Sequence, residues 1–272
     1  MLVCQRNHAA TLHTTAAAST VAIPIQRPRV RIAVISDIHG NFHALSTVLE
    51  AVAEERPDAL WCLGDTVGYG PKPNECCAVL EERGDLCLAG NHDLLALGKT
   101  VVEGDFNPDA ASAGSWTAAE LTAGSRTFLG GLVAHAHTDA ADLYHASARD
   151  PIWEYVLSGE AARTTFDLSG SPLVLVGHSH IPLAISLEGD RIEGAHAPAG
   201  TEVDLSRGRW LCNPGSVGQP RDSDRRAAWL LVDFEARSAS FRRVAYDVAA
   251  TQAEMRAARL PEPLAARLEH GL

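Results

Sequence analysis

Four short apolar runs in this sequence each end in a cluster of metal-type ligands, and this repeated feature constrains the fold more than any other. The first run, residues 32–35, leads into Asp37 and His39, which project to the same side if they continue a strand. The other three runs end in Gly64-Asp65, Gly90-Asn91-His92-Asp93 and Gly177-His178-Ser179-His180. Each cluster alone is typical of a polar strand end or a capped turn, but four in order indicate a shared metal site.

Strand and helix patterns alternate through the first part of the chain. They predict three buried strands and the two helices between them, at residues 30–35, 42–55, 59–63, 74–83 and 85–89. This order favours parallel pairing with right-handed crossovers, and such sheets collect their ligands outside the carboxyl ends of the strands. We therefore expect Asp37, Asp65 and Asn91 to lie at one edge of a sheet.

The pattern changes after Pro182 to short strand-like runs with turn residues between them. These runs lie at residues 183–187, 191–193, 201–205, 209–212, 228–234 and 240–246. They predict antiparallel pairing in a second sheet. A short helix is expected at residues 151–157. The fold class is therefore α/β, a sandwich of two sheets with helices outside.

The composition narrows the classes of protein to consider. At 272 residues the chain suits one large domain or two small ones. Its formal net charge of −11 disfavours general nucleic-acid binding, which needs an excess of Lys and Arg. Phosphate substrates are compatible with this charge, because bound divalent cations reverse its local sign. No apolar stretch is long enough to span a bilayer, so no membrane partner is expected.

Residues 1–28 and the cysteines bear on processing and location. The N-terminal stretch is polar, and it lacks the basic start and the continuous apolar segment of a secretory signal. We expect a disordered extension there, followed by a single domain over residues 29–272. The six cysteines form no Cys-x-x-Cys pair, and three of them lie in apolar strand-like runs. Reduced core thiols in a cytoplasmic protein are therefore expected.

Taken together, these motifs resemble those of the calcineurin-like metallophosphoesterases, and more narrowly their small bacterial phosphodiesterase-like branch. Besides the four ligand clusters, the likeness includes Asp65–Pro71, His145 followed by Arg149-Asp150-Pro151, and Asn213–Gly218. It extends over roughly residues 30–247. The resemblance implies an α/β/β/α sandwich and a centre of two divalent metal ions.

The resemblance also implies a role for each ligand. Asp37, His39 and His180 would hold the first metal, Asn91, His145 and His178 the second, and Asp65 would bridge the two. Mixed carboxylate, imidazole and amide ligands suit Mn, Fe, Zn, Co or Ni better than Ca or Mg, and we take manganese as the first choice.

One of these ligands has close competitors. His135 and His137 lie just upstream of His145 and are also spaced two apart. We prefer His145, because it ends an apolar run and precedes Arg149-Asp150-Pro151.

The expected chemistry is hydrolysis of a phosphate ester. Two metals about 3.5–4 Å apart activate a bridging hydroxide and clamp the phosphoryl oxygens. His92 faces differently from Asn91, so it fits a general acid for the leaving alkoxide, with Asp93 orienting its imidazole. Arg149 and Arg221 are candidates for forked hydrogen bonds to phosphate, although a surface salt bridge explains each equally well.

The sequence thus predicts a dinuclear-metal phosphoesterase acting on small phosphodiesters, with phosphomonoesters as a wider class. A non-catalytic scaffold on the same fold is one alternative, but such a chain is expected to lose ligands or the acid. Here all seven ligands and His92 are present. A serine/threonine-type protein phosphatase is another alternative, but it needs a peptide groove, and the sequence shows no extended insertion to form one.

Overall fold

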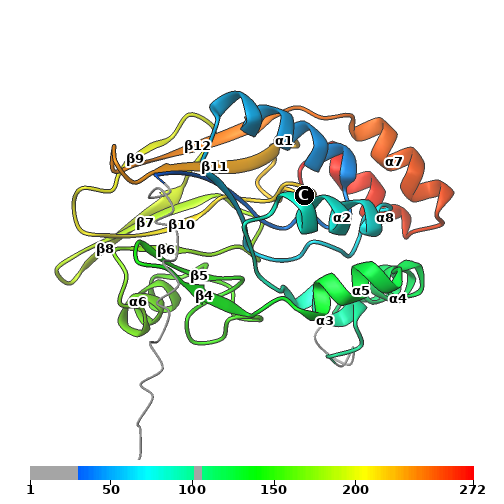
Figure 1. The fold of residues 1–272 in the computed structure, drawn as a ribbon, viewed down its shortest axis with the longest axis horizontal. Helices are drawn as coiled ribbons and strands as arrows, with labels where there is room; N and C mark the ends of the chain where they lie inside the picture. The colour runs from blue at the N-terminus through cyan, green and yellow to red at the C-terminus, as the bar shows by residue number, and fades with distance from the viewer. Residues whose placement is uncertain (1–29, 101–105) are drawn as a thin grey trace, which may run out of the picture.

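Two six-stranded sheets lie face to face in the computed structural model, which describes residues 30–100 and 106–272 (Figure 1). The first sheet has the order β3, β2, β1, β11, β12, β9, with bounds Leu86–Cys87, Ala59–Cys62, Arg31–Ile35, Ala227–Asp233, Ser238–Val244 and Glu202–Asp204. The second has the order β4, β5, β6, β10, β7, β8, with bounds His135–His137, Ala141–Tyr144, Leu173–Leu175, Arg209–Asn213, Leu183–Glu188 and Arg191–His196. The expected two-sheet sandwich is confirmed.

The distribution of strands between the sheets differs from the expectation. The strands after Pro182 do not form one antiparallel sheet, because β9, β11 and β12 join the first sheet and pair with one another and with β1. Strands β4, β5 and β6 from the middle of the chain instead build the second sheet with β7, β8 and β10. Both sheets offer apolar faces, so hydrophobic patterning alone does not decide which sheet a strand joins.

Parallel pairing holds where it matters for ligand placement. Strands β1, β2 and β3 are parallel neighbours in the first sheet, and β5, β6 and β10 are parallel neighbours in the second. The carboxyl ends within each group therefore point the same way. The predicted clustering of polar residues at strand ends follows from this arrangement.

Helices cover the outer face of each sheet (Figure 1). The first sheet carries α1, and α2, α7 and α8 lie on the same side; their bounds are Phe42–Glu55, Pro73–Arg83, Val248–Ala257 and Glu262–Ala266. The second sheet carries α6, and α3, α4 and α5 lie at its side; their bounds are Gly159–Leu168, Asn91–Ala96, Pro108–Glu120 and Ala123–Gly130. A 3₁₀ turn spans Arg267–Glu269.

The helix expected at residues 151–157 is not formed. Turns cover 151–153, and the following residues have no regular structure. The Asp150 side chain accepts hydrogen bonds from the backbone N–H groups of Ile152 and Trp153, each at 3.1 Å. A local turn of this kind competes with a helical start.

The core has an inner and an outer layer that follow the alternation of β1. Ile32 and Val34 point into the layer between the two sheets, whereas Ala33 and Ile35 pack towards α1, where Leu45 is fully buried. A separate cluster lies between α6 and the outer face of the second sheet. Both faces of β1 are thus covered, which explains its continuous apolar run.

Three further expectations concern membrane-spanning helices, the N-terminus and the cysteines. Among the described helices, none has the length and apolar character needed to cross a membrane. Residues 1–28, expected to be a disordered extension, lie outside the described residues. The five cysteines within the described ranges carry free thiols.

Candidate metal centre

The predicted ligands meet at the carboxyl ends of parallel strands from both sheets. Asp37 and His39 follow β1, Asp65 follows β2, His145 follows β5, and His178 and His180 follow β6. Backbone hydrogen bonds join these strand ends, for example from Asp37 N to Gly64 O at 3.0 Å and from Gly177 N to His145 O at 2.8 Å. All seven predicted ligands, including Asn91 at the start of α3, are at most 4% exposed.

The ligand atoms fall into two overlapping groups. The first comprises Asp37, His39, Asp65 and His180, and the second comprises Asp65, His145 and His178; within each group the ligand atoms lie within 4.8 Å of one another. Asp65 belongs to both. Its Oδ2 atom lies 3.6 Å from His39 Nε2 and 3.5 Å from His145 Nε2. This is the position expected of a bridging carboxylate.

In the first group, two imidazole nitrogens face each other, and each carries a lone pair but no hydrogen. His39 Nδ1 donates to Val67 O at 3.2 Å, and His180 Nδ1 donates to Gln219 O at 2.6 Å, because a carbonyl oxygen only accepts. Burial holds the pKa of both imidazoles well below its usual value, so the rings are neutral. Their Nε2 atoms are therefore bare and lie 3.1 Å apart.

Two facing lone pairs repel each other unless a cation lies between them. The separation of 3.1 Å between His39 Nε2 and His180 Nε2 is short enough for one cation to be held by both nitrogens. The backbone carbonyls fix the tautomer of each ring, as outer partners of metal-bound histidines do.

The second group, Asp65, His145 and His178, also contains a buried negative charge that a nearby positive charge must balance. His145 Nδ1 bonds to Leu63 O at 2.9 Å, and its Nε2 lies 3.2 Å from Asn91 Oδ1. Burial lowers the pKa of His145, but the adjacent Asp65 carboxylate outweighs it and raises the pKa to about 9. With no metal bound, this imidazole would thus supply the missing charge as a proton.

His178 differs from the other ligands in the nitrogen that it leaves free. Its Nε2 bonds to Trp153 O at 3.1 Å, which leaves Nδ1 as the atom for a metal. Burial, assisted by His145, lowers the pKa of His178 to about 3. The ring is therefore in the neutral form that binds metals.

Two buried carboxylate oxygens at this centre have no hydrogen-bond partner among the described residues. They are Asp37 Oδ1 and Asp65 Oδ2. Burial raises the pKa of Asp37 to about 7, which reflects the cost of a carboxylate without a compensating cation. Buried carboxylate oxygens that make no hydrogen bond and are surrounded by imidazole nitrogens fit the donor set of a divalent metal.

The glycines that precede the ligands serve close packing. A Cβ atom at Gly90 would lie 2.0 Å from Asp65 Oδ1, and one at Gly177 would lie 2.1 Å from Ser36 Oγ. Neither distance is compatible with a real side chain. The recurring Gly in the ligand clusters therefore allows neighbouring strand ends to approach one another.

A Gly90→Ala substitution should displace Asp65 and lower both stability and metal content. Overpacking of this kind typically costs about 1–3 kcal/mol. Gly170→Ala is the matched control, because a Cβ there would meet nothing within 4 Å. Thermal unfolding and elemental analysis of both variants test this. Full metal content in Gly90→Ala would show that the close approach is not needed.

Five of the seven predicted ligands have left-handed backbone conformations. The φ angles are 54° at Asp37, 52° at His39, 53° at Asp65, 64° at His178 and 60° at His180. This conformation costs a residue with a side chain roughly 1–2 kcal/mol. Strained backbone held by its surroundings is characteristic of functional sites.

His92 lies beside the centre among aromatic rings. Its imidazole is 5% exposed, and its ring centroid lies 4.9 Å from that of His39, 4.3 Å from Tyr69 and 5.0 Å from Phe106. Burial lowers its pKa to about 4. Within the described residues, its buried Nδ1 atom has no hydrogen-bond partner.

The hydrogen bonds of the Asp93 side chain differ from those expected of a residue that orients His92. Its two carboxylate oxygens accept hydrogen bonds from the backbone N–H groups of Val67 and Gly90, each at 3.0 Å, and thereby cap α3. The physical reason is helical geometry, since successive residues on a helix point in different directions. Asp93 thus fixes the loop after Asp65, and its side chain makes no hydrogen bond to His92 among the described residues.

The two arginines that are candidates for phosphate binding have different partners and different exposure. Arg149 forms an ion pair with Glu154 and leaves 51% of its side chain exposed, so the surface salt bridge is the correct interpretation. Arg221 is partly buried; its Nη2 atom lies 2.8 Å from Gln219 Oε1 and 3.5 Å from the Tyr69 hydroxyl. Within the described ranges, no ion pair joins Arg221 to a carboxylate.

Other side chains near the centre were not identified from the sequence. Trp153 and Gln219 act through their backbone carbonyls, so their side chains carry no signal. Tyr155 stacks on His178 with ring centroids 3.9 Å apart. The competitors of His145 lie elsewhere: His135 is exposed and stacks on Tyr144, and His137 is exposed.

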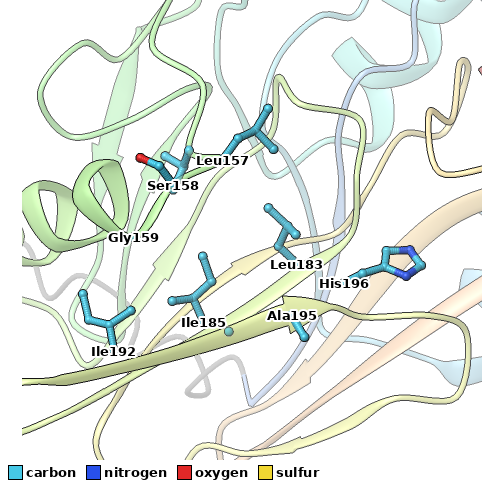
Figure 2. Close-up of a pocket in the computed structure, with 10 residues that line it drawn as sticks. Leu157, Ser158, Gly159, Leu183, Ile185, Ile192, Ala195 and His196 are labelled. Atoms are coloured by element: carbon cyan, nitrogen blue, oxygen red, sulfur yellow. The ribbon is translucent and has the colours of Figure 1, made fainter.

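A cavity of about 330 Å³ lies on the second sheet beside the start of α6, and none of the predicted ligands lines it (Figure 2). Its walls are mainly apolar and come from residues 156–159, β7 and β8. It is therefore separate from the metal centre.

Comparisons with known proteins agree with this geometry. A family model described as calcineurin-like phosphoesterase matches residues 30–182. An uncharacterized protein of Methanocaldococcus jannaschii is 36% identical over 244 residues, which cover 87% of this chain and 96% of that protein. The crystal structure of a metallophosphoesterase from Sphaerobacter thermophilus is 39% identical, with a TM-score of 0.82 over 89% of this chain and 99% of that one.

A shorter match involves a protein named for its substrate. A symmetrical bis(5′-nucleosyl)-tetraphosphatase of Psychromonas ingrahamii is 41% identical over 64 residues, which is 22% of this chain and 23% of that protein.

Proposed function

Because the chain belongs to the calcineurin-like phosphoesterase family and is a metal-dependent phosphoesterase, we propose that it holds two divalent cations and hydrolyses phosphodiesters. The observation that carries the proposal is the position of Asp65 Oδ2, which lies between imidazoles of both ligand groups and has no hydrogen-bond partner among the described residues. A single metal would leave one of these groups without a cation.

The ligands divide between the two proposed metals. The first is assigned to Asp37, His39 and His180, the second to Asn91, His145 and His178, and Asp65 is assigned to both. Manganese remains the first choice, with Fe, Zn, Co or Ni as alternatives, since the donors are imidazole, carboxylate and amide. When bound, two such cations stabilise charge on the phosphoryl oxygens and lower the pKa of the attacking water.

The protein's own groups supply the remaining functions. His92 is proposed to donate a proton to the leaving alkoxide, as its position beside His39 allows. Arg221 is proposed to hydrogen-bond a phosphoryl oxygen, because its guanidinium is close to the centre and its charge is not matched by a described ion pair.

We expect diesters to be better substrates than monoesters or phosphopeptides. A diester carries one negative charge and a monoester nearly two at neutral pH, and Arg221 is the one protein cation that we assign to the phosphoryl group. Turnover per unit concentration of bis-nitrophenyl phosphate, nitrophenyl phosphate and a phosphopeptide, measured after reconstitution with manganese, tests this. A clear preference for the monoester or the peptide would remove the diesterase assignment and leave the dinuclear phosphoesterase.

The alternatives have less support. The tetraphosphatase relative matches less than a quarter of this chain, so it supports phosphoester chemistry rather than a particular substrate. A scaffold would not need buried carboxylate oxygens without hydrogen bonds at Asp37 and Asp65. We also propose a single domain over residues 29–272, because one core between the sheets contains residues from both halves of the chain. The free thiols of the described cysteines support the proposed cytoplasmic location.

A further inference from the structure

We infer that Tyr155 is a stacking platform for a planar ring of the substrate, and that the preferred phosphodiesters therefore carry a nucleobase or a similar aromatic ring. The inference rests on the proposed function, because it places the phosphoryl group at the metal centre. It names a residue that determines which ester is accepted.

The position of Tyr155 is the first observation. Its ring stacks on the imidazole of His178 with centroids 3.9 Å apart and planes at 16°. Yet Tyr155 is 46% exposed, whereas His178 beneath it is 4% exposed. Since His178 covers one face of the ring, a ligand could stack only on the opposite face. The face of the Tyr155 ring opposite His178 is thus a flat apolar surface, and only the ring itself separates it from this predicted metal ligand.

The backbone around Tyr155 holds the ring in place. Two residues before it, Trp153 O accepts a hydrogen bond from His178 Nε2 at 3.1 Å. One residue after it, Val156 is 3% exposed and packs in the cluster between α6 and the second sheet. Val156 and Leu157 line the cavity of Figure 2, and Tyr155 does not. The platform is therefore pre-organised, which reduces the entropy lost on stacking.

Charge and further aromatic rings complete the site. Burial raises the pKa of the Tyr69 and Tyr155 hydroxyls, and the nearby Arg221 guanidinium opposes this at both. Phe106 packs edge-on against Trp153 at 5.5 Å and against His92 at 5.0 Å. A cation and several aromatic rings thus lie near the same centre. A phosphate joined to a flat base by a sugar carries groups that match both.

The test compares two ligands that differ only in the base. AMP and ribose 5-phosphate are titrated calorimetrically into the manganese-loaded full chain, its Tyr155→Ala variant and its Tyr155→Phe variant. Stacking of one base on an aromatic ring corresponds to about 5- to 150-fold in affinity. We expect the parent and Tyr155→Phe to prefer AMP by this factor. In Tyr155→Ala the preference should disappear, while affinity for ribose 5-phosphate and metal content stay within about twofold of the parent values.

Three results would overturn the platform. One is equal affinity of the parent for AMP and ribose 5-phosphate, and another is an AMP preference that survives in Tyr155→Ala. The third is an equal loss of affinity for both ligands in Tyr155→Ala, which would show that the ring only supports His178. A separate measurement tests the proposed function: if the metal-loaded parent did not hydrolyse bis-nitrophenyl phosphate, the proposed function would fail.

Discussion

Replacing Asp65 by asparagine should lower the metal content from two ions per chain to one or none and reduce kcat/KM by at least about a thousandfold. Asparagine keeps the size of the side chain but removes the negative charge that two cations share. Since a bound metal lowers the pKa of water from 15.7 towards about 7, loss of the pair removes most of the nucleophile available at neutral pH. Elemental analysis and turnover of bis-nitrophenyl phosphate measure both effects.

A second buried aspartate serves as the control for this substitution. Asp142 is 5% exposed and accepts hydrogen bonds from Ser169 and Ser171, outside the centre. Asp142→Asn should lower thermal stability but keep the metals and the turnover. If Asp65→Asn retained two metals and the parent kcat/KM, Asp65 would not be a bridging ligand.

Replacing His92 by alanine should leave the metals in place and slow the hydrolysis of alkyl esters by about 10²–10⁴-fold. An alkoxide is a poor leaving group and needs the proton that His92 is proposed to donate. Nitrophenolate leaves without a proton, so nitrophenyl esters should lose less than about tenfold. The measurement is kcat for a dialkyl phosphate and for bis-nitrophenyl phosphate, with metal content determined on the same samples.

Asp93→Asn separates this role from a structural one. The Asp93 carboxylate caps the backbone at Val67 and Gly90, so its amide analogue should lower stability and slow both esters by a similar factor. A large loss confined to the alkyl ester in Asp93→Asn would restore the pairing of Asp93 with His92. Equal losses on both esters in His92→Ala would remove the general acid.

The clustering of the predicted ligands was predictable because the relevant strands are parallel and each has a short polar end. Once β1, β2 and β3 are placed side by side, Asp37 and Asp65 must lie at one edge of the sheet. The apolar run before His145 likewise distinguished it from His135 and His137, both of which are exposed in the structure.

Features that depend on contacts between distant segments were not predictable. Strand β11 belongs to the first sheet because it pairs with β1 across some two hundred residues, and β12 joins that sheet by pairing with β11. The partner of Arg149 and the stacking of Tyr155 depend on the turn at residues 150–153, where a helix had been expected. Backbone carbonyls such as those of Trp153 and Gln219 have no sequence signature, because every residue has one.

The left-handed backbone at five ligands has a consequence for how such a chain evolves. Glycine would adopt these φ angles without steric cost, so a chain selected for stability alone would gain from losing its aspartates and histidines there. Stability and activity are thus in direct conflict at the positions where the two sheets meet. Cations that bind only the native state would offset this loss of stability. The supply of metal would therefore determine how much backbone strain the folded protein can carry.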